Sequence, residues 1–385
     1  MGSFNARDGH KNEYMLTGSF RKEGYDWWWH SFTAINTVTG EKKPFFVEFF
    51  VCNPDLGAKE PIFGQLQANK AAGVKPSYLM VKAGCWGEDS VQLHRFFGWN
   101  DVRIWPKAPF SVMADNCFVS DRQLMGEINV SEEDANNHPE YMSDAGHIRW
   151  DLTIDKQVAF NVGYGTSDIF RALKAFEMYW HAEGMKSKYK GWIEYNGTKY
   201  VVEPDSSYGY ADKNWGRNFT SPWVWLSSNN MKSNLTGQKL EGSVFDIGGG
   251  CPNVFGISLP RQLLSAFWYE GTPYEFNFSK FWTGTRTRFS FKETEEYVYW
   301  HIRQENLGAV MDTKARCAKK DMILVNYEAP DGTKNHNRLW NGGNGIAKIK
   351  LYKKTKYGLL LIDDICAKNL GCEYGEYGDG KESYK

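Results

Sequence analysis

The stretch from Tyr208 to Gly216 gathers the residue types that a proton-transfer site on a hydrophobic molecule needs. It contains Tyr208, Tyr210, Asp212, Lys213, Asn214 and Trp215. A carboxyl group among aromatic rings loses its hydration, which disfavours its charged form and raises its pKa toward that of a usable general acid. An ion pair with Lys213 would act in the opposite direction. We therefore interpret Asp212 as a proton donor, and a hydroxyl of Tyr208 or Tyr210 as the group that orients a substrate oxygen.

Two neighbouring segments can supply the rest of such a site. Residues 179–183 carry Trp180 and His181, and residues 223–229 carry Trp223, Trp225 and Asn229. Consecutive strands usually lie side by side in a β structure, so the three segments can converge. His181 titrates near neutral pH and is a candidate proton relay. The alternation of a strand places Trp223 and Trp225 on one face, where they can form an aromatic wall with Trp180 and Trp215.

A purely structural interpretation of these residues stays open beside the catalytic one. A buried pair of Asp212 and Lys213 that braces a loop between domains, with Asn214 bonded to backbone, would leave the same pattern. Trp29 and His30, within the run Trp-Trp-Trp-His, fit a pocket lining and a core strand equally well.

Other candidates carry a weaker signal. Glu373, beside Tyr374, is a second candidate carboxylate for the pocket. Three histidines in strand-like surroundings are interpreted as structural; they are His94, His147 and His301. Gly248–Gly250 lacks the spacing of a phosphate-binding loop, and we interpret it as a flexible turn.

The composition limits the classes of protein to be considered. The chain has 46 basic and 46 acidic residues, so it lacks the basic surplus on which nucleic-acid binding depends. Phe, Trp and Tyr make up 16% of the residues. Aromatic side chains favour strands and also line sites for hydrophobic or ring-bearing ligands.

The sequence also gives expectations about location and cofactors. We expect a cytoplasmic protein, because the N-terminal residues lack the apolar stretch of a signal peptide and no apolar run is long enough for an integral membrane segment. The 7 cysteines are widely spaced, without a CxxC pair, which favours reduced and mostly buried thiols. No close-spaced ligand pattern supports a metal, and no cofactor is expected.

Strand signals dominate the chain and predict an all-β protein. Short β-branched or aromatic runs alternate with turn residues, which indicates antiparallel sandwiches or barrels. The Asn196-Gly197 pair predicts a type I′ hairpin. One helix is expected near residues 168–178, because Ile169, Leu173 and Phe176 share a helical face. The length of 385 residues favours two domains, which we place at 1–204 and 205–385.

The central segment resembles the tocopherol cyclase family. Its order of motifs here reads Trp180-His181, the Asn196-Gly197 hairpin, Tyr210-Ala-Asp-Lys-Asn-Trp-Gly216, and Trp223-Val-Trp225 leading to Asn229. The runs Trp27–His30 and Gly371–Gly375, together with Asp363, are similar to the family's terminal signatures. Aspartate stands at 212 where the family pattern has glutamate, so the carboxylate is displaced by about one bond length.

The resemblance implies a fold and a reaction. The fold would be two lipocalin-like antiparallel β-barrel or sandwich domains side by side, with a ligand cavity inside or between them. In a tocopherol cyclase, a phenol adds intramolecularly across a prenyl double bond to close a chromanol ring. Such a step needs a proton for the alkene, ring faces that stabilise a cation, and an oriented phenol.

We expect a cofactor-independent cyclase, hydratase or isomerase that adds oxygen across a C=C bond of a small, hydrophobic, phenolic or isoprenoid-like molecule. One alternative is a lipocalin-like carrier of an apolar ligand, without chemistry. Another is a carbohydrate-active β protein, which would present an open groove of stacked aromatic rings instead of an enclosed pocket. The sequence leaves the oligomeric state open.

Overall fold

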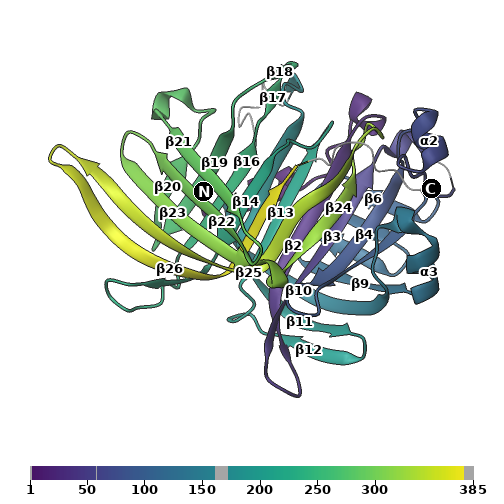
Figure 1. Ribbon diagram of the computed structural model, residues 1–385, viewed down its shortest axis with the longest axis horizontal. Coiled ribbons are helices and arrows are strands. Elements are labelled where there is room, and N and C mark those ends of the chain that lie inside the picture. Colours follow the sequence, from purple (N-terminus) through teal and green to yellow (C-terminus); the bar gives the residue numbers. More distant parts are fainter. Residues whose placement is uncertain (1, 58, 161–171, 377–385) are drawn as a thin grey trace.

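The computed structural model describes residues 2–57, 59–160 and 172–376, and it places most of them in β strands. Two large antiparallel sheets stand side by side, one built from the first half of the chain and one from the second (Figure 1). The prediction of an all-β protein with two antiparallel sheets is therefore confirmed.

The first sheet has 13 strands in the described residues, in the order β5-β4-β3-β2-β12-β11-β10-β9-β8-β7-β6, with β1 on β10 and β13 between β11 and β2. Their bounds are β1 (Gly2–Ser3), β2 (Tyr25–Asn36), β3 (Lys42–Cys52), β4 (Tyr78–Cys85), β5 (Val91–Phe97), β6 (Val102–Trp105), β7 (Ser111–Ala114), β8 (Cys117–Ser120), β9 (Gln123–Val130), β10 (Gly146–Phe160), β11 (Met178–Tyr195), β12 (Thr198–Val202) and β13 (Gly209–Gly216).

The second sheet has 11 strands in the same described ranges, in the order β20-β19-β16-β14-β26-β25-β23-β22-β21, with β15 on β26 and β24 on β25. Their bounds are β14 (Trp223–Ser228), β15 (Asn230–Ser233), β16 (Val244–Gly250), β19 (Gln262–Tyr269), β20 (Thr272–Phe276), β21 (Arg286–Glu293), β22 (Tyr297–Glu305), β23 (Ala309–Ala318), β24 (Met322–Glu328), β25 (Asn335–Thr355) and β26 (Gly358–Gly375). A separate ribbon joins β17 (Asn253–Val254) to β18 (Ile257–Ser258).

Helices are short and peripheral. They are α1 (Ala6–Lys11), α2 (Gln67–Ala71) and α3 (Glu132–Asn137), with 3-10 turns at Gly18–Arg21, Pro54–Leu56, Pro139–Tyr141, Phe281–Thr283 and Lys319–Asp321. The helix expected near 168–178 lies partly outside the described residues. In its described part, Ala172 is helical and Leu173 and Lys174 form a turn, after which Phe176 forms a bridge with Val254 and Met178 begins β11. From Met178 onward the chain pairs with β13 as strand β11, so the expected helix does not extend to residue 178.

The strands that hold the candidate site residues are positioned by hydrogen bonding to their neighbouring strands. Asn196 and Gly197 have φ of 48° and 80°, as a type I′ turn requires, so the predicted hairpin between β11 and β12 is confirmed. Most of the Tyr208–Gly216 segment forms a strand, β13. It pairs with β11 on one side, where Trp180 faces Asn214, and with β2 on the other, where Trp29 faces Asp212.

The chain changes sheets between Gly216 and Trp223, after β13 has completed its pairing with the first sheet. Strand β24 belongs to the second sheet but packs against the first, because Lys82 of β4 donates to the carbonyl of Asn326 and Gln92 of β5 donates to that of Leu324. The division into domains at residue 204 stays a prediction.

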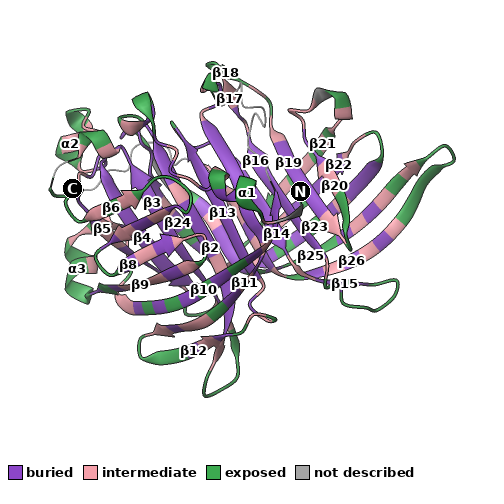
Figure 2. Cartoon of the chain, turned by 180° about the vertical axis from the view of Figure 1, so that it is seen from behind, coloured by how far each residue is buried: buried purple, intermediate pink, exposed green. Residues whose placement is uncertain are grey.

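Buried residues concentrate where the two sheets meet (Figure 2). All residues of β13 and β14 are buried, whereas β21 alternates between exposed and half-buried residues. The Trp180 ring lies against Gly248 of β16, where an added Cβ would stand 2.7 Å from the indole. The interpretation of Gly248–Gly250 as a turn is therefore wrong: this run is the end of a strand whose lack of side chains admits a tryptophan.

We expect Gly248→Ala to lower the free energy of unfolding by about 1–3 kcal/mol, because the new methyl group overpacks the Trp180 ring. Gly308→Ala is the matched control, since its Cβ would meet its nearest atom at 3.8 Å; its change should stay within about 0.5 kcal/mol. Urea denaturation measures both. Equal stabilities of the two variants would contradict the packing described for Trp180.

Candidate active site

A narrow aromatic pocket lies between the two sheets. Its lining combines β2, β11 and β13 of the first sheet with β14, β24, β25 and β26 of the second, and consists of Trp27, Trp29, Met178, Asp212, Phe219, Thr220, Trp223, Trp225, Tyr327, Leu339 and Glu373. The pocket spans about 530 Å³ with its mouth, of which about 30 Å³ can hold the centre of a water molecule. A ligand larger than water therefore requires these side chains to move apart.

Strand alternation decides which residues of the Tyr208–Gly216 segment face this pocket. Asp212 lies beside Trp29 of β2 and lines the pocket. Lys213 points to the opposite face, where its ammonium pairs with Asp26 and lies 3.8 Å from the centre of the Trp28 ring. The anticipated pair between Asp212 and Lys213 is therefore absent, and Lys213 does not line the pocket.

The Asp212 carboxyl is held by one of its two oxygens. Its Oδ2 accepts hydrogen bonds from Trp180 Nε1 at 2.8 Å and from the Tyr210 hydroxyl at 3.1 Å. Its Oδ1 is buried and has no hydrogen-bond partner among the described residues. One oxygen of the carboxyl is therefore fixed by two donors, and the other is buried without a donor.

The surroundings of Asp212 favour its protonated form. Burial raises the pKa of the Asp212 carboxyl well above its usual range, and the nearby charges of Glu373 and Glu183 raise it further. The hydrogen bonds from Trp180 and Tyr210 act in the opposite direction. Desolvation is the largest of these effects, and it favours the protonated form of the carboxyl.

A second buried aspartate, Asp246, is linked to Asp212 through Tyr210, and it was not predicted from the sequence. Asp246 of β16 accepts from the Tyr210 hydroxyl at 3.1 Å through Oδ2 and from Trp225 Nε1 at 3.1 Å through Oδ1. Burial, followed by the charge of Asp212, raises the pKa of Asp246 well above its usual range. Only its place in a glycine-ended, apolar strand could have marked Asp246 as unusual.

Glu373 is the other carboxylate in the pocket lining, and both of its oxygens are engaged. Trp223 Nε1 donates to Oε2 at 2.9 Å, and Asn341 Nδ2 donates to Oε1. Asn341 is in turn fixed by Trp86 Nε1 at 2.8 Å. Burial raises the pKa of Glu373 to about 7, so its charge changes near neutral pH.

A buried ion pair supports the pocket beneath Tyr327. The Tyr327 hydroxyl donates to Glu48 Oε2 at 2.8 Å, and Lys82 Nζ lies 3.3 Å from the same oxygen. The ammonium also lies 3.5 Å from the centre of the Tyr327 ring. Both charged side chains are fully buried, so each depends on the other for compensation.

The structure places His181 away from Asp212. His181 is paired in register with Lys213, so the two side chains share the face that points away from the pocket. His30 occupies that face too, with its Nδ1 at 2.8 Å from the Tyr189 hydroxyl. The two side chains thus lie on opposite faces of the sheet, an arrangement that does not support the predicted relay from His181 to Asp212.

Some of the other predicted site residues line the pocket, some lie directly behind its lining, and the rest lie elsewhere. Trp29, Trp223, Trp225 and Glu373 line the pocket, which bears out the placement of Trp223 and Trp225 on one face. Trp180, Tyr210 and Asn214 lie behind it, and Asn214 accepts from the Tyr25 hydroxyl at 2.7 Å. Four residues lie outside the lining: Trp215 stacks on Tyr179, Tyr208 lies under Lys42, Asn229 donates to the carbonyl of Gly209, and Tyr374 stacks on Phe291.

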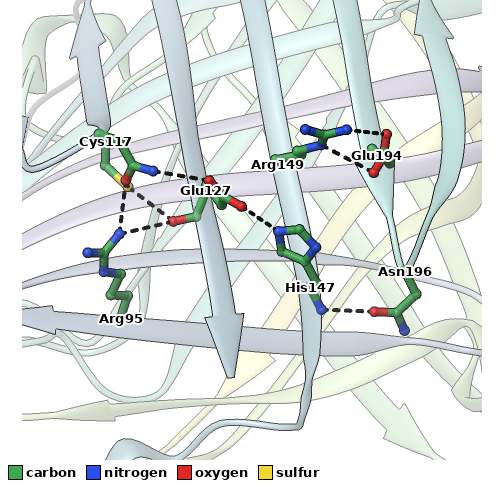
Figure 3. A network of polar contacts seen from close by, with 8 residues as sticks. Arg95, Cys117, Glu127, His147, Arg149, Glu194 and Asn196 are labelled. Atoms are coloured by element: carbon green, nitrogen blue, oxygen red, sulfur yellow. Dashed lines mark hydrogen bonds and ion pairs between the residues drawn. The ribbon is translucent and has the colours of Figure 1, made fainter. Parts of the chain in front are cut away.

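The histidines interpreted as structural have ordinary partners. His147 Nε2 lies 2.6 Å from Glu127 in a partly exposed network that also contains Arg95 and Asn196 (Figure 3). His94 Nδ1 contacts the carbonyl of Tyr141 at 2.8 Å, and His301 lies beside Asp312.

Neither a metal centre nor a membrane-crossing helix is found in the described ranges. No group of three or more His, Cys, Asp or Glu side chains there is arranged to hold a metal ion. The helices of these ranges are all too short, or too polar, to cross a bilayer.

Comparison with known proteins assigns a family. The sequence model described as "Tocopherol cyclase-like" matches residues 106–376, which is more than half of the chain. The chain belongs to the tocopherol cyclase-like family. The matched range contains β13, β14, β16 and β26, and so includes Asp212, Asp246 and Glu373.

Individual members and structures are more distant. The chloroplastic tocopherol cyclase of Zea mays is 30% identical over 162 residues, which cover 41% of this chain and 31% of that protein. The match spans less than a third of the length of the curated relatives. Kievitone hydratase from Nectria haematococca has a TM-score of 0.48 at 11% identity over 99% of both chains. CghA, crystallised with Sch210972, has a TM-score of 0.40 at 10% identity over 92% of this chain and 89% of its own.

In this member of the tocopherol cyclase-like family, we expect Lys82→Met to lower the free energy of unfolding by about 3–5 kcal/mol, because it leaves Glu48 buried without its cation. The double variant Lys82→Met/Glu48→Leu should recover much of that loss. Lys320→Met is the control, since its pair with Glu88 is exposed and its removal should change stability little. Thermal denaturation distinguishes these outcomes, and a Lys82→Met variant as stable as Lys320→Met would contradict the buried pair.

Proposed function

We propose that the chain is a cofactor-independent enzyme of the cyclase or hydratase type, which adds an oxygen nucleophile across a C=C bond of a hydrophobic phenolic or isoprenoid-like molecule. The observation that carries the proposal is the unpartnered Oδ1 of Asp212 in a pocket of indole rings. Membership of the tocopherol cyclase-like family supports a cyclase or hydratase reaction.

The proposed reaction begins with Asp212 in its acid form. Its proton moves to one carbon of the alkene, the C=C π pair forms the new C–H bond, and the other carbon becomes a cation. A phenol or water oxygen then bonds to that cation and loses its proton, which returns to the Asp212 carboxylate. Protons balance over the cycle, so the step needs no external acid, oxidant or cofactor. Positioned general acids contribute about 10²–10⁴-fold to rate.

The indole rings suit the cationic intermediate. Trp27, Trp29, Trp223 and Trp225 all line the pocket. Contacts between a cation and an aromatic face contribute about 0.5–2 kcal/mol each when water is excluded. The same rings exclude water that would otherwise compete with an intramolecular phenol, so the degree of exclusion would decide between ring closure and hydration.

The proposal also specifies where selectivity would arise. The pocket is narrow and mostly apolar, with carboxyls at Asp212 and Glu373. Trp223 and Asn341 engage both oxygens of Glu373, which leaves Asp212 as the acid with an open oxygen. An alkene must therefore approach Asp212 Oδ1, while the polar end of the substrate lies toward another part of the lining.

Asp212→Asn tests the proposed donor, because the amide keeps the size and loses the acidic proton. We expect kcat for ring closure of a prenylated hydroquinone to fall by about 10²–10⁴-fold. The dissociation constant for the same compound, followed by tryptophan fluorescence, should change little. Prenyl chains of increasing length provide the set of compounds to be tested.

Asp363→Asn is the matched control. Asp363 is also a buried aspartate that accepts from a tyrosine hydroxyl, Tyr269, but it lies outside the pocket. It should retain wild-type turnover. If Asp212→Asn converted the substrate as fast as the wild type, Asp212 would not be the donor; binding without turnover in the wild type would favour a carrier.

A further inference from the structure

The hydroxyl of Tyr210 connects two buried carboxyls that come from different sheets. It lies 3.1 Å from Asp212 Oδ2 on β13 and 3.1 Å from Asp246 Oδ2 on β16. Trp225 Nε1 donates to the hydroxyl oxygen at 3.2 Å and to Asp246 Oδ1 at 3.1 Å. Three polar groups therefore surround one hydroxyl group.

The hydrogen-bonding capacity of a hydroxyl limits how these contacts can be satisfied. A tyrosine O–H donates one hydrogen bond, and its oxygen accepts from others. The indole N–H of Trp225 can only donate, so it occupies one of the positions at which the Tyr210 oxygen accepts a hydrogen bond. The hydroxyl proton serves one carboxyl, and the other carboxyl must then donate its own proton to the Tyr210 oxygen. At least one of the two carboxyls is therefore protonated whenever all three contacts are hydrogen bonds.

The charges around the pair do not compensate two carboxylates. Glu183 on β11 and Glu373 on β26 add negative charge to the surroundings of Asp212. Lys213, the adjacent cation in the sequence, points to the other face and pairs with Asp26. Trp29 and Trp180 stand beside Asp212 on the flanking strands, and they carry no charge. Two like charges bridged by one hydroxyl are unfavourable, as in other carboxyl pairs that share a proton.

We propose that Asp246 is a positioning residue for the proton donor: through the Tyr210 hydroxyl it forms a carboxyl pair with Asp212 that retains a proton. This inference rests on the proposed function, in which Asp212 protonates the substrate.

The pair completes the proton cycle. Before the reaction both carboxyls carry a proton. When Asp212 has given its proton to the substrate, the pair retains the proton of Asp246, which donates to Tyr210 while Tyr210 donates to Asp212. These two hydrogen bonds stabilise the Asp212 carboxylate until the proton released by the adding oxygen returns to it, so no proton is gained or lost overall.

Asp246→Asn and Tyr210→Phe should displace the pH dependence of kcat in opposite directions. The acid form of Asp212 is active, so kcat is full at low pH and falls as pH rises through its pKa. An amide at 246 removes the negative charge of Asp246, and it leaves Asp212 as the carboxyl that accepts from the Tyr210 hydroxyl. Both changes favour the Asp212 carboxylate, so the decrease in kcat moves to lower pH. Loss of the Tyr210 hydroxyl removes a hydrogen bond that favours the carboxylate, which moves the fall to higher pH.

Each displacement should reach about one pH unit, which corresponds to about tenfold in activity on the alkaline limb. A prenylated hydroquinone that the wild type converts is the probe, and Asp363→Asn is the control that should keep the wild-type profile. A uniform loss of kcat in Asp246→Asn, with the wild-type pH profile, would mean that Asp246 is only structural and would overturn the proposal.

Infrared spectroscopy without substrate separates this inference from the proposed function. With isotope-labelled aspartate carboxyls, difference spectra against Asp212→Asn isolate the protonated-acid C=O band of Asp212. The band should persist at neutral pH in the wild type. As the pH is raised, the band of Asp246→Asn should disappear at a lower pH than that of the wild type. If these spectra show the shared proton but no substrate is converted, the proposed function fails and the pair stands. If conversion occurs without the band or its displacement, the pair is wrong.

Discussion

The removal of the Asp212 carboxyl from water is the constraint on which the rest of the site depends. The group lies between two sheets, against indole rings, with one oxygen bonded to Trp180 and Tyr210 and the other without a partner. Burial of an unpaired acceptor costs about 1–3 kcal/mol, and burial of an unpaired charge costs more. The protonated form avoids the larger of these costs. The same desolvation that opposes folding thus favours the protonated form of the Asp212 carboxyl.

Strand β13 keeps this acid apart from the nearest cation. Successive side chains point to opposite faces, so Asp212 faces the pocket and Lys213 faces Asp26 and Trp28. Both sheets are needed to build the site, because Asp246 and Glu373 come from the second sheet whereas Asp212 comes from the first. Packing of the two sheets therefore brings these carboxyls together, and Glu48 of the buried pair with Lys82 accepts a hydrogen bond from Tyr327 of the second sheet.

Local sequence signals predicted the parts of the fold that local physics determines. The Asn196-Gly197 hairpin followed from the φ angles that its turn requires, and the common face of Trp223 and Trp225 followed from strand alternation. His181 was assigned to the wrong face because two neighbours in a strand cannot both point into one pocket, and the pairing of β11 with β13 decides which does. Asp246 was missed because its role depends on a contact across sheets, 36 residues from Tyr210. Gly248 was misread because its partner, the Trp180 ring, lies on another strand.

The central claim is that an exchangeable acid in this pocket protonates an alkene carbon, and deuterium transfer tests it most directly. A prenylated hydroquinone would be converted in D2O, and the product analysed by NMR. The account predicts one deuterium on the carbon that was the less substituted end of the double bond, on one face only, and its disappearance together with turnover in Asp212→Asn. A cyclised or hydrated product without deuterium at that carbon would contradict the account.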